Sequence, residues 1–326
     1  MKILVIRFSS IGDIVITTPV VRCLRKQFPT AEIHYLTKPQ FAGIIEPNPY
    51  VDQVILLKEN LADTIAQLKL AEFDIVIDLH KNLRTRRIKW SLRKPWYFYN
   101  KLNFRKWFFV NFKINLLPKI HLVDRYFEGL RKLEIQNDGE GLDYFLPQEF
   151  STKLADYNLT DNEYIAISIG GTYATKRMPK NVLQLLIKRL KLPVVLLGQG
   201  EDDDKLASSL CETNAGNITN LVGKLNLHQS AFIIKHAASV ITGDTGLMHI
   251  AAAFKKNTQV VWGNTHPYLG MYAYASKLAT NHQVDLACRP CSKLGSAKCP
   301  RKHFNCMQMQ NWDTIVYNCN SIELTQ

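Results

Sequence analysis

Short apolar runs rich in β-branched residues alternate along this chain with stretches whose apolar residues recur at helical spacing. The first apolar run is Lys2–Arg7 and the last of the series is Gln259–Trp262. Runs of this length are typical of strands buried on both faces, and strand–helix alternation with short links predicts a parallel, doubly wound sheet. The pattern therefore places the chain in the α/β class.

The alternation stops after the first half and then starts again, which predicts two domains. In the first half we expect strands at Lys2–Arg7, Glu32–Thr37, Gln53–Leu57 and Asp74–Leu79, and helices at Asp13–Phe28 and Leu61–Leu70. In the second half we expect strands at Tyr164–Ile169, Pro193–Leu197, Asn220–Val222, Ser239–Thr242 and Gln259–Trp262, and helices at Pro179–Leu190, Asp202–Cys211, Leu227–Ala237 and Leu247–Phe254. A length of 326 residues suits two ordinary domains. We place them at residues 1–155 and 156–326.

The charge balance points to an anionic partner. The chain has 41 Lys and Arg against 28 Asp and Glu, a formal charge of +13. Nucleic acid, a membrane surface and a phosphorylated substrate are all compatible with such an excess, and so is a simple contribution to solubility. The longest apolar runs of the chain are far shorter than the roughly 20 residues that cross a bilayer. Met1 leads directly into the first strand without a cleavage site, so we expect a cytoplasmic protein.

Ligands of doubly wound sheets bind where strands turn into helices. The first such turn is Ser9–Asp13, which contains Ser10 and ends with an aspartate at the start of a helix. Asp13 is compatible with a capping role, because its carboxylate can accept bonds from free backbone N–H groups. It is also compatible with a role as a base at the rim of a site.

Three turns of the second half carry groups that suit a phosphorylated ligand. Gly170–Lys176 offers the hydroxyls of Thr172 and Thr175 and the charge of Lys176, which can contact a phosphate or remain solvated. Gly198–Asp202 contains Glu201, a possible partner of ribose hydroxyls or an ordinary helix start.

The turn at Gly243–His249 is the sharpest of these features. A strand enters it and a helix rich in small residues leaves it, so free N–H groups at the helix start can bind an anion. Thr245 and His249 can add to this site, although His249 is also compatible with a place in the core.

Two segments outside the turns stand apart in composition. Residues 84–113 mix Arg and Lys with Trp, Tyr and Phe, which suits nucleic acid, an anionic glycolipid or an anionic membrane. Near the C-terminus, the spacing C-x2-C-x7-C-x6-C is compatible with a structural zinc site or with reduced thiols in a packed tail. Its four residues are Cys288, Cys291, Cys299 and Cys306.

Two of the turns, in this order, resemble a known family. Ser9-Ser-Ile-Gly-Asp13 and Gly243-Asp-Thr-Gly-Leu-Met-His-Ile-Ala-Ala-Ala253 resemble glycosyltransferase family 9, the lipopolysaccharide heptosyltransferases. Segments 198–202 and 220–227, the latter containing Lys224, also fall where that family has similar sequence. The resemblance covers nearly the whole chain, although Met178 stands where the family often has Trp.

The resemblance implies a GT-B fold, with two Rossmann-like domains whose parallel sheets face each other across a cleft. It further implies inverting transfer from a nucleotide sugar, typically ADP-heptose, with no metal required. Asp13 matches the family's general base and Lys176 its donor-phosphate lysine. The donor loop matches at Asp244, Thr245, Gly246 and His249.

With the donor assigned to the second domain, we expect the acceptor on the first. The expected acceptor residues are Ser10, Arg84, Arg86, Arg87 and Lys89. The expected acceptor is the lipid A–inner core glycolipid, reached by peripheral contact at the cytoplasmic face of the inner membrane. Nucleic acid is not expected as a partner. Alternatives are a GT-B transferase with another donor and a non-catalytic nucleotide-sugar-binding or nucleic-acid-binding module.

Overall fold

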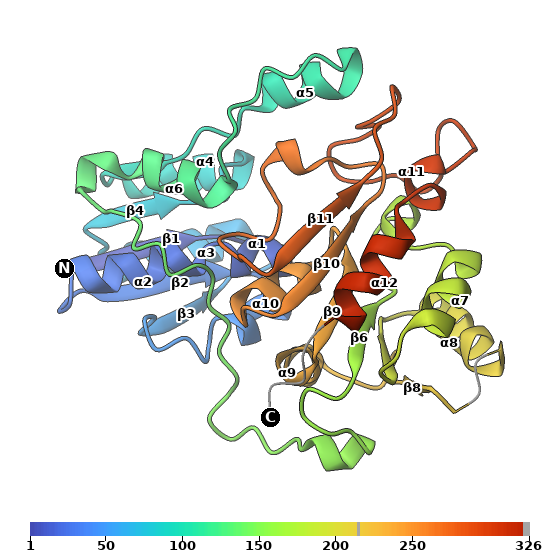
Figure 1. Ribbon diagram of the computed structural model, residues 1–326. Coiled ribbons are helices and arrows are strands. Elements are labelled where there is room, and N and C mark those ends of the chain that lie inside the picture. The colour runs from blue at the N-terminus through green and yellow to red at the C-terminus, as the bar shows by residue number, and fades with distance from the viewer. Residues whose placement is uncertain (214–215, 322–326) are drawn as a thin grey trace. The chain divides into compact units, whose positions relative to one another are not determined.

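A computed structural model describes residues 1–213 and 216–321 (Figure 1). The chain divides into two compact units. Unit 1 comprises Met1–Lys101 and Ile120–Gln148, and unit 2 comprises Leu102–Lys119 and the residues from Glu149 onward. Each unit has its own parallel sheet, as the restarted alternation predicts.

Unit 1 contains a five-stranded sheet in the order β3-β2-β1-β4-β5, and every pair of strands is parallel. Its strands are β1 (Lys2–Ile6), β2 (Glu32–Thr37), β3 (Gln53–Leu56), β4 (Ile75–Asp78) and β5 (Trp96–Phe98). Its helices are α1 (Ile11–Val15), α2 (Thr18–Gln27), α3 (Leu61–Leu70), α4 (Leu83–Leu92) and α6 (Leu122–Gly129). One core lies between the sheet and α3 and α4, where Leu68 and Ile88 pack against Leu4 and Ile6.

Unit 2 contains a six-stranded sheet in the order β11-β10-β9-β6-β7-β8, again parallel throughout. Its strands are β6 (Ile165–Ser168), β7 (Val194–Leu197), β8 (Ile218–Asn220), β9 (Ser239–Gly243), β10 (Asn257–Trp262) and β11 (Ala279–Gln283). Its helices are α5 (Asn103–Phe112), α7 (Lys180–Arg189), α8 (Glu201–Thr213), α9 (Leu227–His236), α10 (Gly246–Ala253), α11 (Asn305–Gln308) and α12 (Trp312–Asn320). Helices α7, α8 and α12 share one core on one face of this sheet. Met178 is buried in that core.

Each sheet has a point at which the chain reverses its direction of growth. In unit 1 the chain runs outward from β1 to β3 and then returns to β4, beside β1. In unit 2 it runs from β6 to β8 and then returns to β9, beside β6. Loops that leave two such neighbouring strands diverge at their carboxyl ends, and ligands of this fold class bind in the opening. The loops concerned follow β1 and β4 in unit 1, and β6 and β9 in unit 2.

The structure departs from the expected elements in identifiable places. The single helix expected at Asp13–Phe28 is two helices, because the chain turns at Thr17 and Pro19 opens the second helix. The short strand expected at Asn220–Val222 lies two residues earlier, as β8. Elements α4, β5, α5, α6, β11, α11 and α12 were not expected. In the described ranges, 1–213 and 216–321, every helix is too short or too polar to cross a bilayer.

The segment 102–119, which the sequence placed in the first domain, packs with unit 2. Its helix α5 is anchored there by the ring of Phe109, whose centroid is 5.5 Å from that of His266. The Nζ of Lys113 also donates to the backbone oxygen of Pro290 at 2.7 Å.

Candidate active-site residues in the two units

In unit 2, the loop after β6 is held tightly against the loops after β9 and β10. A Cβ added to Gly243 would lie 2.5 Å from the carbonyl oxygen of Lys176. One added to Gly263 would collide with the carbonyl oxygen of Thr175. Glycine at both positions therefore lets the backbone carrying Lys176 lie directly beside the turn at residues 243–246.

This approach brings together two residues that the sequence predicted as donor-binding. The Nζ of Lys176 lies 2.7 Å from Oδ2 of Asp244, and both side chains are mostly buried, with 16% and 13% exposed. The hydroxyl of Thr265 donates to the same Oδ2 at 3.0 Å. Thr265 therefore holds Asp244 in place independently of the lysine.

The neighbouring positions of this turn have distinct environments. The hydroxyl of Thr245, at the start of α10, lies 3.1 Å from that of Thr242. Gly246 is the first residue of α10, and His249 is buried one turn later in the same helix. The turn and the start of α10 therefore bring Asp244, Thr245 and Gly246 to the carboxyl edge of β9, with His249 behind them.

The other predicted donor residues lie in different settings. Thr175 is buried, and its hydroxyl donates to the carbonyl of Ser296 at 2.9 Å and accepts from the N–H of that residue at 2.8 Å. This hydroxyl therefore joins the loop to the C-terminal segment. Thr172 is exposed.

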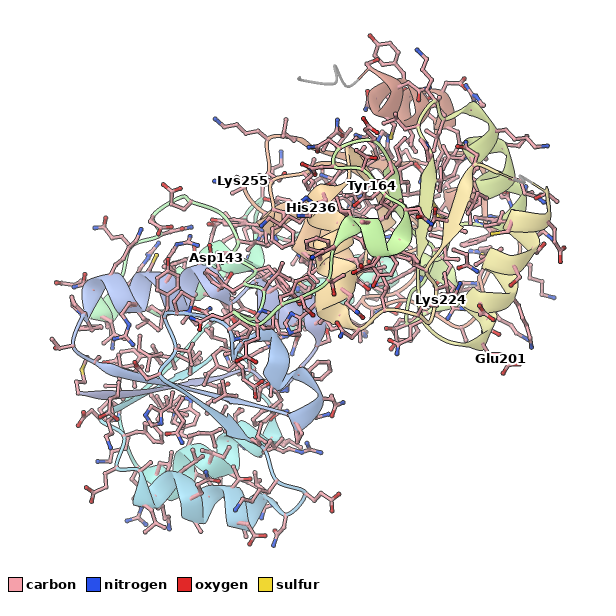
Figure 2. The ribbon with its side chains drawn as sticks, turned by 90° about the horizontal axis from the view of Figure 1, so that it is seen from below. Asp143, Tyr164, Glu201, Lys224, His236 and Lys255 are labelled. Atoms are coloured by element: carbon pink, nitrogen blue, oxygen red, sulfur yellow. The ribbon has the colours of Figure 1, made fainter. Side chains whose placement is uncertain are left out.

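Glu201 and Lys224 lie at the periphery of unit 2. Glu201 is at the outer rim in Figure 2, and it accepts from Lys205 at 2.5 Å. Lys224 is exposed, and its Nζ donates to the carbonyl of Asn220 at 2.9 Å.

Sequence reasoning missed several residues that support these loops. Asp203 is buried below the turn at Gly198, where its Oδ2 accepts from the N–H of Gln199 at 3.1 Å. Arg177 donates to the carbonyl of Gly171 at 2.9 Å and lies 3.5 Å from Asp203. These two residues connect the loops after β6 and β7.

Arg289 braces the same region from the C-terminal tail. Its buried guanidinium donates to the carbonyl oxygens of Gly263, at 2.7 Å, and of Thr265, at 3.0 Å. Burial lowers the pKa of Arg289, partly offset by nearby thiols and Asp285. In the sequence, Arg289 is marked only as a basic residue inside a cysteine-rich tail. That position does not reveal that its hydrogen-bond partners are the carbonyl groups of Gly263 and Thr265.

In unit 1, Asp13 lies on the first turn of α1, at the carboxyl end of β1. Its Oδ2 accepts from the backbone N–H and the hydroxyl of Ser10, at 3.1 and 2.8 Å. Its Oδ1 forms an ion pair with the guanidinium of Arg7, and 24% of the Asp13 side chain is exposed. Asp13 therefore caps the helix and keeps part of its surface accessible to a ligand.

Arg7, which the sequence did not single out, fixes this carboxylate from inside the sheet. It is buried and donates to the carbonyl oxygens of Ser9, at 2.8 Å, and Leu79, at 2.5 Å, and to the hydroxyl of Tyr126, at 3.3 Å. Burial lowers the pKa of Arg7, but Asp13 together with the nearby tyrosines outweighs burial, and the net shift is upward. The guanidinium therefore stays charged, and its opposite charge favours the ionised form of its partner.

His80 follows β4 and lies beside the same strand end. Its ring centroid is 4.7 Å from that of Phe8, and its Nδ1 is buried without a hydrogen-bond partner. Burial and the charges of Arg7 and Lys101 lower its pKa to about 3. The imidazole is therefore neutral at physiological pH.

The predicted acceptor residues of unit 1 begin at this edge and continue along α4. Ser10 is exposed at the start of α1, and Arg84, Arg86 and Arg87 are exposed on α4. The guanidinium of Arg86 lies over the ring of Trp90, and the ammonium of Lys89 lies 5.5 Å from the ring centroid of Phe98. Arg84 is on the first turn of α4 and thus nearest the strand ends, whereas Lys89 is farther along the helix.

The cysteine-rich tail does not fit the zinc expectation. Across residues 1–213 and 216–321, no group of three or more His, Cys, Asp or Glu side chains is arranged to hold a metal ion. The Sγ of Cys291 instead donates to the carbonyl of Cys288 at 3.0 Å. Burial raises the pKa of Cys291 and Cys306 to about 11, so both remain thiols at neutral pH.

Comparisons with known proteins identify the family of this chain. The profile of glycosyltransferase family 9 (heptosyltransferase) matches residues 62–300. Lipopolysaccharide heptosyltransferase 1 of Campylobacter coli is 25% identical over 296 residues, covering 82% of this chain and 85% of that protein.

Solved structures share the whole fold. A family 9 glycosyltransferase from Veillonella parvula superposes with a TM-score of 0.77 at 22% identity, covering 98% of this chain and 96% of that one. The E. coli ADP-heptose lipopolysaccharide heptosyltransferase II superposes with a TM-score of 0.74 at 19% identity, covering 99% and 98%. The two parallel-sheet units are thus a GT-B fold, and the chain belongs to glycosyltransferase family 9, the heptosyltransferases.

Proposed function

We propose that this enzyme transfers a heptose from ADP-heptose to the lipid A–inner core of lipopolysaccharide, with inversion at the anomeric carbon. The observation that carries the proposal is Asp13, a carboxylate paired with Arg7 and hydrogen-bonded to Ser10 at the end of β1, with part of its surface exposed. Relatives named as lipopolysaccharide heptosyltransferases support the reaction class.

In the proposed reaction, unit 2 binds the donor. Departure of the nucleotide diphosphate requires a group that stabilises the developing negative charge. Lys176 supplies an ammonium beside the start of α10, where free N–H groups and the helix dipole also favour an anion. Thr172, Glu201 and Lys224 remain candidates for contacts with the rest of the donor, and Thr175 acts by holding the loop.

Unit 1 binds the acceptor. An inverting transfer needs one base, which takes the proton of the acceptor hydroxyl as its oxygen bonds to the anomeric carbon and the bond to the diphosphate breaks. Asp13 is that base in our proposal, and Ser10 orients it. The exposed arginines of α4 attract the phosphate or carboxylate groups of the glycolipid.

The proposed acceptor is anchored in a membrane by its acyl chains. We therefore place the enzyme in the cytoplasm, in peripheral contact with the inner membrane.

The test of the base is the substitution Asp13→Asn, with Asp63→Asn as a matched control. Asp63 is an exposed acidic residue on the first turn of α3, also in unit 1. We expect Asp13→Asn to lower turnover by about 10²-fold or more, because the proton acceptor is lost, and to leave ADP affinity in calorimetry nearly unchanged, because the proposed donor site lies in unit 2. The control should behave as wild type.

Near-wild-type turnover of Asp13→Asn at saturating acceptor would remove Asp13 from the reaction. The donor is tested separately, by measuring nucleotide release from ADP-heptose and from UDP- and GDP-sugars with the same acceptor. Release of UDP or GDP without release of ADP would show that the donor assignment is wrong while the transferase assignment stands.

A further inference from the structure

Helix α5 presents its apolar side to solvent. Phe104, Trp107 and Phe112 are 73%, 53% and 55% exposed. Their rings pack on one another and on Phe108, with the Trp107–Phe112 and Phe108–Phe112 centroids 5.6 and 4.8 Å apart. We call Phe104, Trp107, Phe108 and Phe112 the aromatic face.

The opposite side of the same helix is the side that attaches to unit 2. Lys106 and Phe109 are buried there, and Phe109 contacts the ring of His266. Lys113, just past the helix, donates to the carbonyl of Pro290, and Asn103 accepts from Lys293 at 3.0 Å. Residues 106, 109 and 113 follow helical spacing, so α5 is held in a fixed orientation with the aromatic face turned outward.

The apolar surface continues beyond the helix, and exposed basic residues lie close by in the chain. Ile114 and Leu116 are 52% and 51% exposed. Arg105 and Lys119 are exposed close by in the chain. Residues 79–123 contain no Asp or Glu at all, although they contain many Lys and Arg.

We propose that the aromatic face of α5, with Ile114 and Leu116, inserts into the interface of an anionic lipid bilayer. Exposed Trp and Phe on one side of a short helix, within a chain segment that has basic residues and no acids, are the composition that lies in the headgroup region of such membranes. Patches of this kind on a soluble protein mark an interaction site. The proposal rests on the proposed function only in that it names how the enzyme reaches a membrane-anchored acceptor.

The charge pattern favours a bilayer over the other possible partners. A second copy of this chain would bring the same acid-free segment against itself, and like charges would repel each other. Single-stranded nucleic acid stacks its bases singly on separate aromatic rings. Here the rings instead pack on one another into one continuous apolar surface.

The experiment is vesicle sedimentation of the full chain at low salt. Wild type should bind vesicles of phosphatidylglycerol and phosphatidylethanolamine and should bind phosphatidylcholine vesicles far less. The triple variant F104S/W107S/F112S should lose at least about tenfold in binding to the anionic vesicles, because the inserted apolar area is removed. The matched control is L70S/L185S/Y317S, three large apolar side chains exposed elsewhere by 86%, 65% and 70%. It should bind as wild type does.

Insertion of α5 into the bilayer is tested with brominated lipids, which quench tryptophan fluorescence on contact. Trp107→Phe keeps the face apolar, so it should still bind vesicles but lose most of the quenching. Full quenching in Trp107→Phe would show that another tryptophan, such as the exposed Trp90, enters the bilayer, and would overturn the proposal.

Other results would also overturn it. The first is a wild-type protein that does not bind anionic vesicles. The second is a triple variant that binds these vesicles as wild type does. The third is a dimer of the wild type, detected by light scattering, that the triple variant does not form. Loss of binding to single-stranded RNA without loss of vesicle binding in the triple variant would assign the face to nucleic acid instead.

The triple variant should transfer sugar normally to a water-soluble acceptor without acyl chains. Failure of that reaction in wild type would count against the proposed function and leave the vesicle result intact.

Discussion

The substitution Lys176→Ala tests the donor site most directly. Lys176 projects from the loop after β6, and its ammonium is 2.7 Å from Asp244 on the turn after β9. A diphosphate bound at the start of α10 would compete with Asp244 for that ammonium. Removal of Lys176 therefore takes away a charged contact to the ligand and also leaves a carboxylate beside it.

The size of the effect follows from these two contributions. A hydrogen bond to a charged group contributes about 1.5–3 kcal/mol, which is about 10- to 150-fold in the dissociation constant of ADP. Asp244 is 13% exposed and is still held by Thr265, so it stays in place when the lysine is lost. Its repulsion of the diphosphate moves our expectation to the upper half of that range.

Calorimetric titration with ADP measures the effect, and Lys180→Ala is the matched control. Lys180 is an exposed lysine at the start of α7, four residues along the chain. The double variant K176A/D244N should recover part of the lost affinity, because the uncompensated carboxylate is gone. Unchanged ADP affinity in Lys176→Ala, or an equal loss in Lys180→Ala, would refute the assignment of Lys176 to the donor phosphates.

Three further predictions concern unit 1. The α4 cations are Arg84, Arg86, Arg87 and Lys89. Neutralising all four should raise the acceptor KM in steady-state kinetics and leave the donor KM unchanged, and the effect should be smaller at high salt. The pKa of His80 is lowered to about 3, so its ring signals in NMR should not move between pH 7 and pH 5, where a histidine of ordinary pKa titrates. Hydrogen bonds from Arg22 hold the pKa of Asp138 well below its usual value. Asp138 therefore stabilises the fold above about pH 4, and this stabilisation is lost as the pH falls. The substitution Asp138→Asn should make the free energy of unfolding depend less on pH in that range.

The sheets were predictable because their strands are dominated by continuous apolar runs. Every residue of β4, β6 and β7 is buried, and such strands leave a clear pattern in the sequence. The missed strands are at sheet edges and are short or polar: β5 has three residues, and β11 reads ATNHQ with only one of its five residues buried. Helices α4 and α5 were hidden because basic and aromatic residues obscure any helical pattern of apolar residues.

The turns were predictable and their supporting contacts were not. A glycine or an aspartate after an apolar strand marks Asp13 and the turn at residues 243–246, so the sequence alone indicates where chemistry is possible. The partners of Arg7 and Arg289 come from residues far along the chain, such as Leu79, Tyr126 and Gly263. Such pairings depend on the strand order, which the sequence does not specify.

The two ion pairs at the strand ends present opposite charges to a ligand. In unit 1 the cation is the buried member: Arg7 is held by three further acceptors, so it cannot turn away, and the accessible group is the Asp13 carboxylate. In unit 2 the anion is the anchored member, because Thr265 holds Asp244, whereas Lys176 has a long flexible side chain that can move toward a phosphate. In the proposed reaction, Asp13 would be the fixed proton acceptor and Lys176 the movable ammonium beside the departing diphosphate.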